Sequence, residues 1–205
     1  QISIETPGLF SRSDAFNVDF SSFREKEYSF PLPVGKATVL NDNVLRITTK
    51  EGDAVKAMFD GVVRLSRAHE DMGNVIVIRH RNGLETVYAN NESNLVKVGQ
   101  SVRAGHTIAI VGSRDGKTYC DFSIMVNGCR INPSTIISVN SHRLRKQMLT
   151  CRRNGKYVDI TSSAGNNRLM AAESMDEDPF ENDSKFELDL SELDDQSWAF
   201  PLPDA

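Results

Sequence analysis

Apolar and polar residues alternate between Thr118 and Val126, where the chain reads TYCDFSIMV. Successive side chains of a strand point to opposite faces, so Tyr119, Asp121 and Ser123 are expected on one face and the apolar residues between them on the other. Asn127-Gly128 follows, and this dipeptide favours a two-residue hairpin turn because both positions tolerate positive φ. The pattern predicts a half-buried strand that ends in a hairpin.

Short runs rich in β-branched and apolar residues precede this strand. Turn signals separate them, notably Arg-Asn-Gly at 81–83 and Arg-Asp-Gly at 114–116. Short strands at this spacing indicate a compact antiparallel all-β domain. We expect its strands within the runs 44–49, 53–67, 74–80, 84–90, 102–112 and 120–126.

Two segments of this domain repeat the pattern Gly-x-x-Val-x-Ala, at 52–57 and at 99–104. Each glycine can adopt the conformation of a tight turn, and each valine enters the strand that follows. The doubling predicts a sheet built from two related halves.

Residues 1–29 are expected to form an N-terminal arm, too short for a domain of its own. Phe-Pro-Leu-Pro at 30–33 then opens the body in extended conformation, because proline fixes φ and has no N–H to donate. The apolar residues expected to pack the arm onto another surface are Phe16, Val18, Phe20 and Phe23.

The frame of the arm returns near the end of the chain. Residues 186–203 match residues 16–33 at a constant offset of 170, with seven of eighteen positions identical, including Phe-Pro-Leu-Pro. A gapless match of this length is unlike chance, so residues 198–205 are predicted to begin a second, related module.

Charge divides the chain. The net charge is −4, but residues 173–195 contain eleven carboxylates and one lysine, a net of −10, which leaves +6 for the remainder. So acidic a segment has few apolar side chains to bury, and residues 166–197 are predicted to be a solvated linker.

No apolar run approaches the roughly 20 residues that cross a bilayer, and no leader opens the chain. Either the protein is cytoplasmic or an export signal has been removed.

A second hairpin is predicted around Asn154-Gly155, within a segment that spans 139–165. Its cations could protect an edge hairpin from aggregation, or could bind an acidic partner such as the chain's own acidic segment. Nucleic acid is not expected, because Tyr157 is the hairpin's one aromatic residue. The predicted basic patch comprises Arg143, Arg145, Lys146, Arg152, Arg153 and Lys156.

Three cysteines, Cys120, Cys129 and Cys151, leave at least one unpaired. Their spacing fits no zinc motif, and they are expected to be small strand residues. A bridge between Cys129 and Cys151 would require an oxidising compartment.

Five motifs occur in order between residues 30 and 134: FPLP, TKEGDAVKAMFDGVV, GNVIVIRHRNGLETVYAN, NLVKVGQSVRAGHTIAIVGS and DFSIMVNGCRINP. Together they resemble the LytM-type M23 zinc metallopeptidases, especially tandem M23 proteins of Bacteroidetes. The resemblance implies an antiparallel β-sandwich or barrel-sandwich hybrid at 30–138, with the basic hairpin and the extended arms added to it.

In that family, His-x3-Asp and the second histidine of His-x-His hold zinc, while the first histidine of that pair and that of Tyr-Ala-His assist catalysis. Three protein ligands leave a position for a water whose pKa falls to about 7. The corresponding positions here are Asp42 and Arg46, Tyr119 and Asp121, and Asn90. All five lack the required residue type, so no zinc cofactor and no catalytic residue are expected.

The remaining histidines do not restore such a site, because the resemblance places His69, His80, His106 and His142 in loops or on outward strand faces.

The replacement residues suggest chemistry of their own. Asp42, Arg46 and Asp121 could form an ion pair or a triad, with Tyr119 adding a hydroxyl and Tyr88 nearby. Such a group would be either a structural polar plug or part of a ligand-binding cleft. A plug predicts that Arg46→Ala lowers the melting temperature substantially, because two buried carboxylates would then face each other.

Two functions remain open. The first is a non-catalytic LytM/M23-like domain of an exported protein of the periplasm or cell envelope, which binds peptidoglycan or regulates a peptidoglycan hydrolase. The second is the regulatory half of a tandem M23 endopeptidase whose active zinc site lies in a second domain beyond Ala205. Both predict that this chain alone does not cleave peptides.

Overall fold

The chain folds almost entirely into antiparallel β-structure. The computed structural model describes residues 14–80, 83–126, 129–155, 157–162 and 170–174. Within these ranges the helical elements are two 3₁₀ turns, Glu25–Glu27 and Pro133–Thr135, and no helix is long and apolar enough to cross a membrane. The all-β prediction is therefore confirmed.

The strands, in chain order, are β1 (Ala15–Asp19), β2 (Lys36–Leu40), β3 (Val44–Thr48), β4 (Ala54–Lys56), β5 (Gly61–His69), β6 (Gly73–His80), β7 (Leu84–Asn94), β8 (Ser101–Val102), β9 (Thr107–Arg114), β10 (Lys117–Val126), β11 (Cys129–Ile131), β12 (Ile137–Ser138), β13 (Arg143–Leu144), β14 (Met148–Asn154), β15 (Tyr157–Ser162) and β16 (Met170–Ser174).

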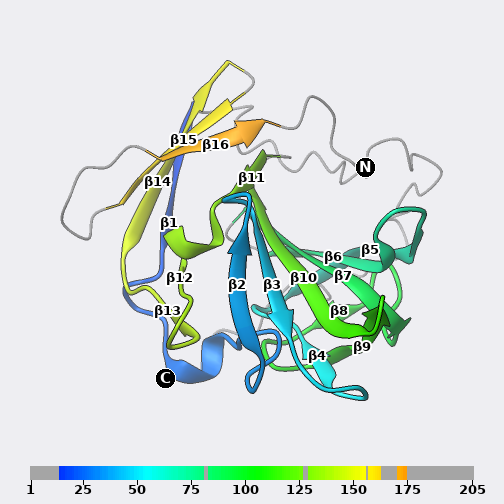
Figure 1. Ribbon diagram of the computed structural model, residues 1–205. Helices are drawn as coiled ribbons and strands as arrows, with labels where there is room; N and C mark the ends of the chain where they lie inside the picture. Colours follow the sequence, from blue (N-terminus) through cyan, green and yellow to red (C-terminus); the bar gives the residue numbers. More distant parts are fainter. Residues whose placement is uncertain (1–13, 81–82, 127–128, 156, 163–169, 175–205) are drawn as a thin grey trace.

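One continuous sheet joins fourteen of these strands, and β12 pairs with β13 separately. In Figure 1, β1, β14 and β15 form one side of the molecule, β5 to β9 form the other, and β10 and β11 lie between them. Strand β10 is the hub, because it pairs with β3, β7, β9 and β11 along different parts of its length. The strand predicted by alternation is thus the one from which the sheet branches.

The repeated Gly-x-x-Val-x-Ala segments adopt equivalent positions. Gly52 and Gly99 have φ of 84° and 87°, and the valines that follow are buried in the short strands β4 and β8. Strand β4 pairs with β9, which follows the second copy, while β8 pairs with β5, which follows the first. This reciprocal pairing makes each half complete the other.

Two predicted runs are interrupted. The run 53–67 divides into β4 and β5 at residues 57–60, and the run 102–112 divides into β8 and β9 around Gly105, whose φ is 81°. Turn chemistry was predicted more accurately: Asp115 and Gly116 both have positive φ, and Val126 pairs directly with Cys129 across the expected hairpin.

The N-terminal arm belongs to the body of the fold. Val18 and Phe20 are buried in the main core, and the Phe20 ring stacks on Phe59 with centroids 5.7 Å apart. Phe30 and Leu32 are buried as well. The surface onto which the arm was expected to pack is the domain that it precedes.

The basic hairpin forms as predicted and turns at Gly155, whose φ is 61°. It is not an edge hairpin, because β1 pairs with β14 and β16 pairs with β15. The exposed cations Arg143, Arg145 and Lys146 precede β14, whereas Arg152 and Arg153 lie at its far end. The prediction that these five cations form a single basic patch was therefore wrong. The sixth, Lys156, lies outside the described residues.

Residues 166–197 were predicted to be a solvated linker, but part of this segment is paired in the sheet. Residues 170–174 form β16, which pairs with β15 and β11 and so ties the hairpin sheet to the central strands. The prediction failed here because β15 and β11 each offer an edge whose main-chain groups a passing strand can pair with. Residues 163–169 and 175–205, including the predicted second module, lie outside the described residues.

The three cysteines are buried and unbonded to one another, so no bridge joins Cys129 to Cys151. Burial raises the pKa of the Cys120 and Cys151 thiols, which keeps them protonated and unreactive at neutral pH.

Candidate functional site

The candidate site lies on the face of the central sheet that points away from the main core. Strands β5, β6, β7, β10 and β3 place alternate side chains on this site face. Its centre is a separate buried apolar cluster, against which Met72 packs: Leu65, Val75, Val77, Val87, Ala89 and Met125. Charged residues lie at opposite ends of this apolar centre.

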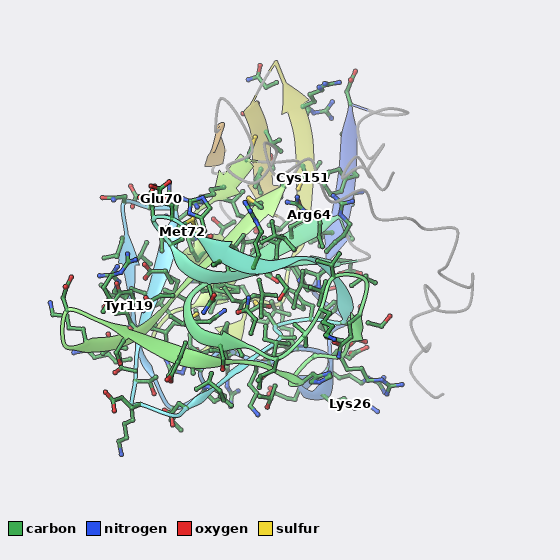
Figure 2. The ribbon with its side chains drawn as sticks, turned by 90° about the vertical axis from the view of Figure 1, so that its right-hand side faces the viewer. Lys26, Arg64, Glu70, Met72, Tyr119 and Cys151 are labelled. Carbon is green, nitrogen blue, oxygen red and sulfur yellow. The ribbon has the colours of Figure 1, made fainter. Side chains whose placement is uncertain are left out.

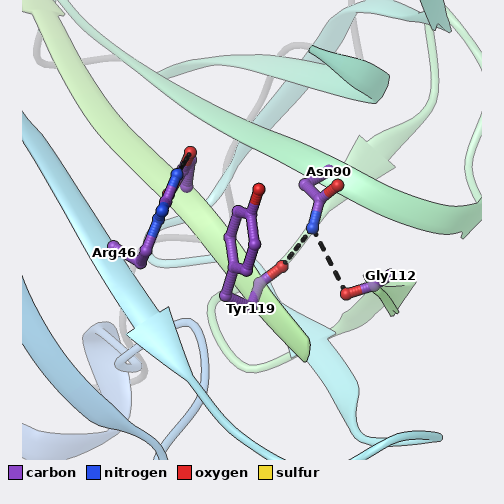
Figure 3. Close-up of polar contacts among 5 residues, drawn as sticks. Arg46, Asn90, Gly112 and Tyr119 are labelled. Atoms are coloured by element: carbon purple, nitrogen blue, oxygen red, sulfur yellow. Dashed lines mark hydrogen bonds and ion pairs between the residues drawn. The ribbon is translucent and has the colours of Figure 1, made fainter. Parts of the chain in front are cut away.

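One end holds an arginine–carboxylate pair on neighbouring strands. Arg46 of β3 lies directly opposite Asp121 of β10. Its Nε donates to Asp121 Oδ1 at 2.8 Å, and its Nη2 donates to Oδ2 at 2.9 Å. The guanidinium carbon also lies 3.9 Å from the ring centroid of Tyr119 (Figure 3). Hydrogen bonding to Asp121 raises the pKa of Arg46, whose charge is thereby fixed.

Asn90 supports this end of the site face by binding the main chain of the neighbouring strands. Its φ is 67°, a left-handed conformation that asparagine tolerates better than most residues. The Asn90 side-chain nitrogen donates to the carbonyl oxygens of Tyr119, at 2.8 Å, and Gly112, at 3.3 Å (Figure 3). A side chain at Gly112 would meet the Asn90 carbonyl oxygen at 2.3 Å, so this position requires glycine. Asn90 therefore holds β9 and β10 in register beside the ion pair.

Of the expected ion pair or triad, the structure contains the pair. Asp42 lies in the turn between β2 and β3 with φ of 58° and is exposed. Within the described part of the chain, no hydrogen bond or ion pair joins Asp42 to Arg46. The triad prediction was wrong because two consecutive positive-φ residues, Asn41 and Asp42, set the direction of this turn.

A zinc ion does not fit these residues. Both carboxylate oxygens of Asp121 accept from Arg46, and a permanently charged guanidinium repels a cation. The described residues contain no cluster of three His, Cys, Asp or Glu side chains suited to a metal. Whether zinc binds the protein stays a prediction that metal analysis must test.

Tyr88 and His80 belong to the opposite, core side of the sheet. The Tyr88 hydroxyl accepts the Met58 N–H at 2.8 Å and lies 2.8 Å from the Thr86 hydroxyl. His80 places Nδ1 2.8 Å from the Asp60 carbonyl oxygen and Nε2 2.7 Å from Thr86 Oγ1. A carbonyl oxygen only accepts, so the neutral imidazole carries its proton on Nδ1.

Burial lowers the pKa of His80 to about 4 and raises that of Tyr88. The placement of Tyr88 beside the site was therefore wrong, and so was the outward position expected for His80. Strand alternation explains both positions. Thr86 and Tyr88 share the core side of β7, and His80 shares the core side of β6 with Ile76 and Ile78.

A second charged group at the other end of the site face was missed from the sequence. Arg64 donates two hydrogen bonds to the carboxylate of Glu85, one of them from Nη2 to Oε1 at 3.2 Å. Arg79 Nη2 lies 3.6 Å from the same carboxylate. A signal was present: Arg79 and Glu85 interrupt apolar positions at the adjoining ends of the runs 74–80 and 84–90. Figure 2 shows Arg64 well separated from Tyr119.

Residues 42–133 match the family model described as Peptidase family M23. This matched range contains both charged ends of the site face. These residues form an M23 domain.

Curated proteins similar to the M23 domain include activators and an enzyme. The murein hydrolase activator EnvC of Escherichia coli (strain K12) is 42% identical over 89 residues, which cover 42% of this chain and 21% of EnvC. The peptidoglycan DD-endopeptidase ShyC of Vibrio cholerae is 36% identical over 87 residues, 42% of this chain and 20% of ShyC. The murein hydrolase activator NlpD of E. coli K12 is 37% identical over 89 residues, which cover 42% of this chain and 24% of NlpD.

The similarity thus spans between about a fifth and a quarter of these relatives' length. Among solved structures, the antimicrobial peptidase lysostaphin from Staphylococcus simulans is 13% identical, with a TM-score of 0.50, over 74% of this chain and 92% of that one. This likeness supports the β-rich fold of the M23 domain and nothing more specific.

Proposed function

We propose that this M23 domain is non-catalytic and acts in the cell envelope, where it binds peptidoglycan or regulates a peptidoglycan hydrolase. The observation that carries the proposal is the bidentate Arg46–Asp121 pair stacked on Tyr119. It puts a fixed organic cation where the resemblance expects a zinc ligand. Relatives that are named murein hydrolase activators support the regulatory half of the proposal.

The pair lacks the means to activate water. Amide hydrolysis by this family's chemistry requires a metal-bound water and a base, and neither a guanidinium nor the engaged carboxylate of Asp121 supplies them. Arg46 can bind instead. Two of its five N–H groups are used by Asp121, and its side chain is 36% exposed. The others can donate to a carboxylate or carbonyl oxygen, groups that wall peptides and protein partners both present.

The direct test combines metal analysis with a binding assay. We expect the purified chain to contain no stoichiometric zinc, and to sediment with peptidoglycan sacculi or to stimulate an amidase that digests them. Arg46→Ala should abolish that effect. Arg103→Ala is the matched control, because Arg103 is an exposed arginine outside the site face. Stoichiometric zinc with peptidase activity, or equal loss in both variants, would contradict the proposal.

A second function rests on the internal repeat. Val18, Phe20, Phe30 and Leu32 are core residues, and at the offset of 170 their counterparts are Leu188, Leu190, Phe200 and Leu202. Since apolar character is kept at the positions that the first copy buries, we propose as an alternative that the chain is the regulatory half of a tandem M23 endopeptidase. The encoding sequence beyond Ala205 tests this: His-x3-Asp and His-x-His motifs there support it, and a stop codon refutes it.

A further inference from the structure

Strand β2 has an open edge next to the Arg46 end of the site face. Within the described residues it pairs with β3 alone, over five residues and without a register shift. The open side of such a regular ladder can accept a further strand. Other strands of the large sheet with one partner suit this less. Strand β8 has two residues, β4 contains a register shift, and β1 lies on the side of the molecule formed by β14 and β15 (Figure 1).

The hydrogen-bond pattern shows which main-chain groups of β2 point outward. The Thr49 N–H donates to the Thr118 carbonyl oxygen at 3.1 Å, so odd-numbered residues of this strand bond to β10. Even-numbered residues of β3 therefore bond to β2, and their partners there are also even-numbered. The N–H and C=O groups of Ala37 and Val39 consequently point away from β3. In the part of the chain that the structure describes, these groups have no hydrogen-bond partner.

The side chains of β2 alternate in the same way. Ala37 and Val39 pack against the main core, so Lys36 and Thr38 project on the side of the site face. Lys36 and Thr38 are exposed, and Thr38 lies directly opposite Arg46. A strand added to β2 would extend this row, at two strand spacings, or about 10 Å, from the strand that carries Arg46.

The chemistry of the edge specifies its occupant. The outward groups recur at every second residue, about 6.8 Å apart, which is the repeat of an extended polypeptide. Lys36 is the only charged residue of β2, and Asp42 lies beyond the other end of the strand. A carboxylate directly opposite Lys36 would be favourable, whereas a cation there would be repelled, and a hydroxyl side chain would pair well with Thr38.

We propose that an extended segment of a protein partner pairs with the open edge of β2 and places a carboxylate side chain opposite Lys36. The inference rests on the proposed function and selects its regulatory form, in which the partner is a peptidoglycan hydrolase. Main-chain bonds to Ala37 and Val39 supply affinity, and side chains beside Lys36 and Arg46 supply specificity. A glycan strand has no main-chain ladder of this spacing, so the wall itself is not expected at this edge.

Hydrogen-exchange NMR of the full-length chain gives the direct readout. In the free chain, the amide protons of Ala37 and Val39 should exchange rapidly, whereas that of Thr38 should exchange slowly because it bonds to β3. Addition of an amidase that the chain stimulates should slow exchange at Ala37 and Val39 by at least about tenfold. Slow exchange of both amides in the free chain, or no added protection in the complex, overturns the proposal.

Proline tests the edge without breaking the β2–β3 ladder. Ala37→Pro removes an outward N–H and places its ring on the open side, so it should abolish amidase stimulation. Asn17→Pro is the matched control on the open edge of β1. Its N–H also points outward, because the Phe20 N–H donates to the Gln147 carbonyl oxygen and even-numbered residues of β1 therefore bond to β14. This control should stimulate the amidase as the wild type does.

Lys36→Glu keeps the exposed position and reverses its charge, so it tests the proposed carboxylate without altering the core. It should reduce amidase stimulation several-fold. Retained stimulation in both Ala37→Pro and Lys36→Glu, or equal loss in Asn17→Pro, overturns the proposal and leaves the regulatory function in place.

Sedimentation with sacculi separates this proposal from the proposed function. A wild-type chain that sediments with sacculi but stimulates no amidase overturns the edge proposal, while the proposed binding to peptidoglycan stands. A wild-type chain that neither sediments nor stimulates overturns both. Loss of stimulation in Ala37→Pro and Lys36→Glu, with wild-type activity in Asn17→Pro, supports both.

Discussion

Two arginine–carboxylate pairs occupy the same face of one sheet and differ mainly in burial. Arg46 and Asp121 are joined by two hydrogen bonds, with side chains 36% and 25% exposed. Arg64 and Glu85 are also joined by two, with side chains 5% and 6% exposed. The two pairs have the same number of hydrogen bonds, but their exposure to solvent differs several-fold.

The difference separates structural from functional roles. A buried charge that loses its partner has little water to replace it, so the Arg64–Glu85 pair contributes more to holding the sheet together than an exposed pair does. A half-exposed pair costs little to rearrange, and its guanidinium keeps donors that face solvent. The Arg46 end is therefore the better place for a ligand, although its geometry is the more regular of the two.

The largest effect should come from breaking the buried pair. Glu85→Ala removes a buried carboxylate that lies against both Arg64 and Arg79, and we expect it to lower the free energy of unfolding by about 3 to 5 kcal/mol. Urea denaturation of the full-length chain measures the change.

Replacing the pair as a unit sharpens that result. Arg64→Met/Glu85→Leu removes both charges while keeping apolar volume, so it should recover most of the stability lost in Glu85→Ala. Equal destabilisation by the single and the double variant would show that packing, rather than charge, governs this end of the site face.

The contrast between the pairs explains what the sequence could predict. Alternation placed Asp121 and Tyr119 on one face, and the motif spacing brought Arg46 to the same site, because both rest on regular strand geometry. Asp42 was misplaced because counting along a chain does not give the direction of a turn. Tyr88 was misplaced because both faces of β7 are buried over residues 84–91, so apolar content does not distinguish them.

Long-range pairing set the other limit. The hydrogen bonds of β16 to β15 and β11 join residues whose local sequence, MAAES, carries no strong strand pattern. Its place follows from the two open edges that the rest of the fold provides. The linker was predicted from charge composition, which bears on how well a segment is solvated. It does not show whether the segment pairs with distant strands.

The next effect concerns pH and the core side of the same sheet. His80 is buried, and burial lowers its pKa from 6.5 to about 4. Between these values the unfolded chain binds a proton that the folded chain refuses, so stability falls as pH drops from about 6.5 towards 4. The shift corresponds to a loss of about 3 kcal/mol.

His80→Gln isolates this contribution, since glutamine keeps a donor and an acceptor but does not titrate. Thermal unfolding between pH 7 and pH 4.5 should show a smaller loss of stability in the variant than in the wild type. Parallel pH dependences would mean that other groups, such as the carboxylates, account for the acid sensitivity.

The smallest effect on stability is expected at the exposed pair. Arg46→Ala should lower the free energy of unfolding by about 1 kcal/mol or less, because Asp121 can return to water when its partner is removed. This expectation replaces the large loss predicted from two facing carboxylates, since Asp42 does not approach Arg46. Urea denaturation, run beside Glu85→Ala, places the two pairs on one scale.

Double-mutant cycles measure the coupling energy of each pair and so compare the two pairs directly. The coupling energy of Arg46 with Asp121 should be about 1 kcal/mol or less, while that of Arg64 with Glu85 should be several-fold larger. If Arg46→Ala also abolishes binding to sacculi or hydrolase, the end of the site face that contributes less to stability is the one that contributes more to recognition. A large coupling at Arg46 would instead restore the structural plug, because a pair that rigid has little freedom to exchange Asp121 for a ligand.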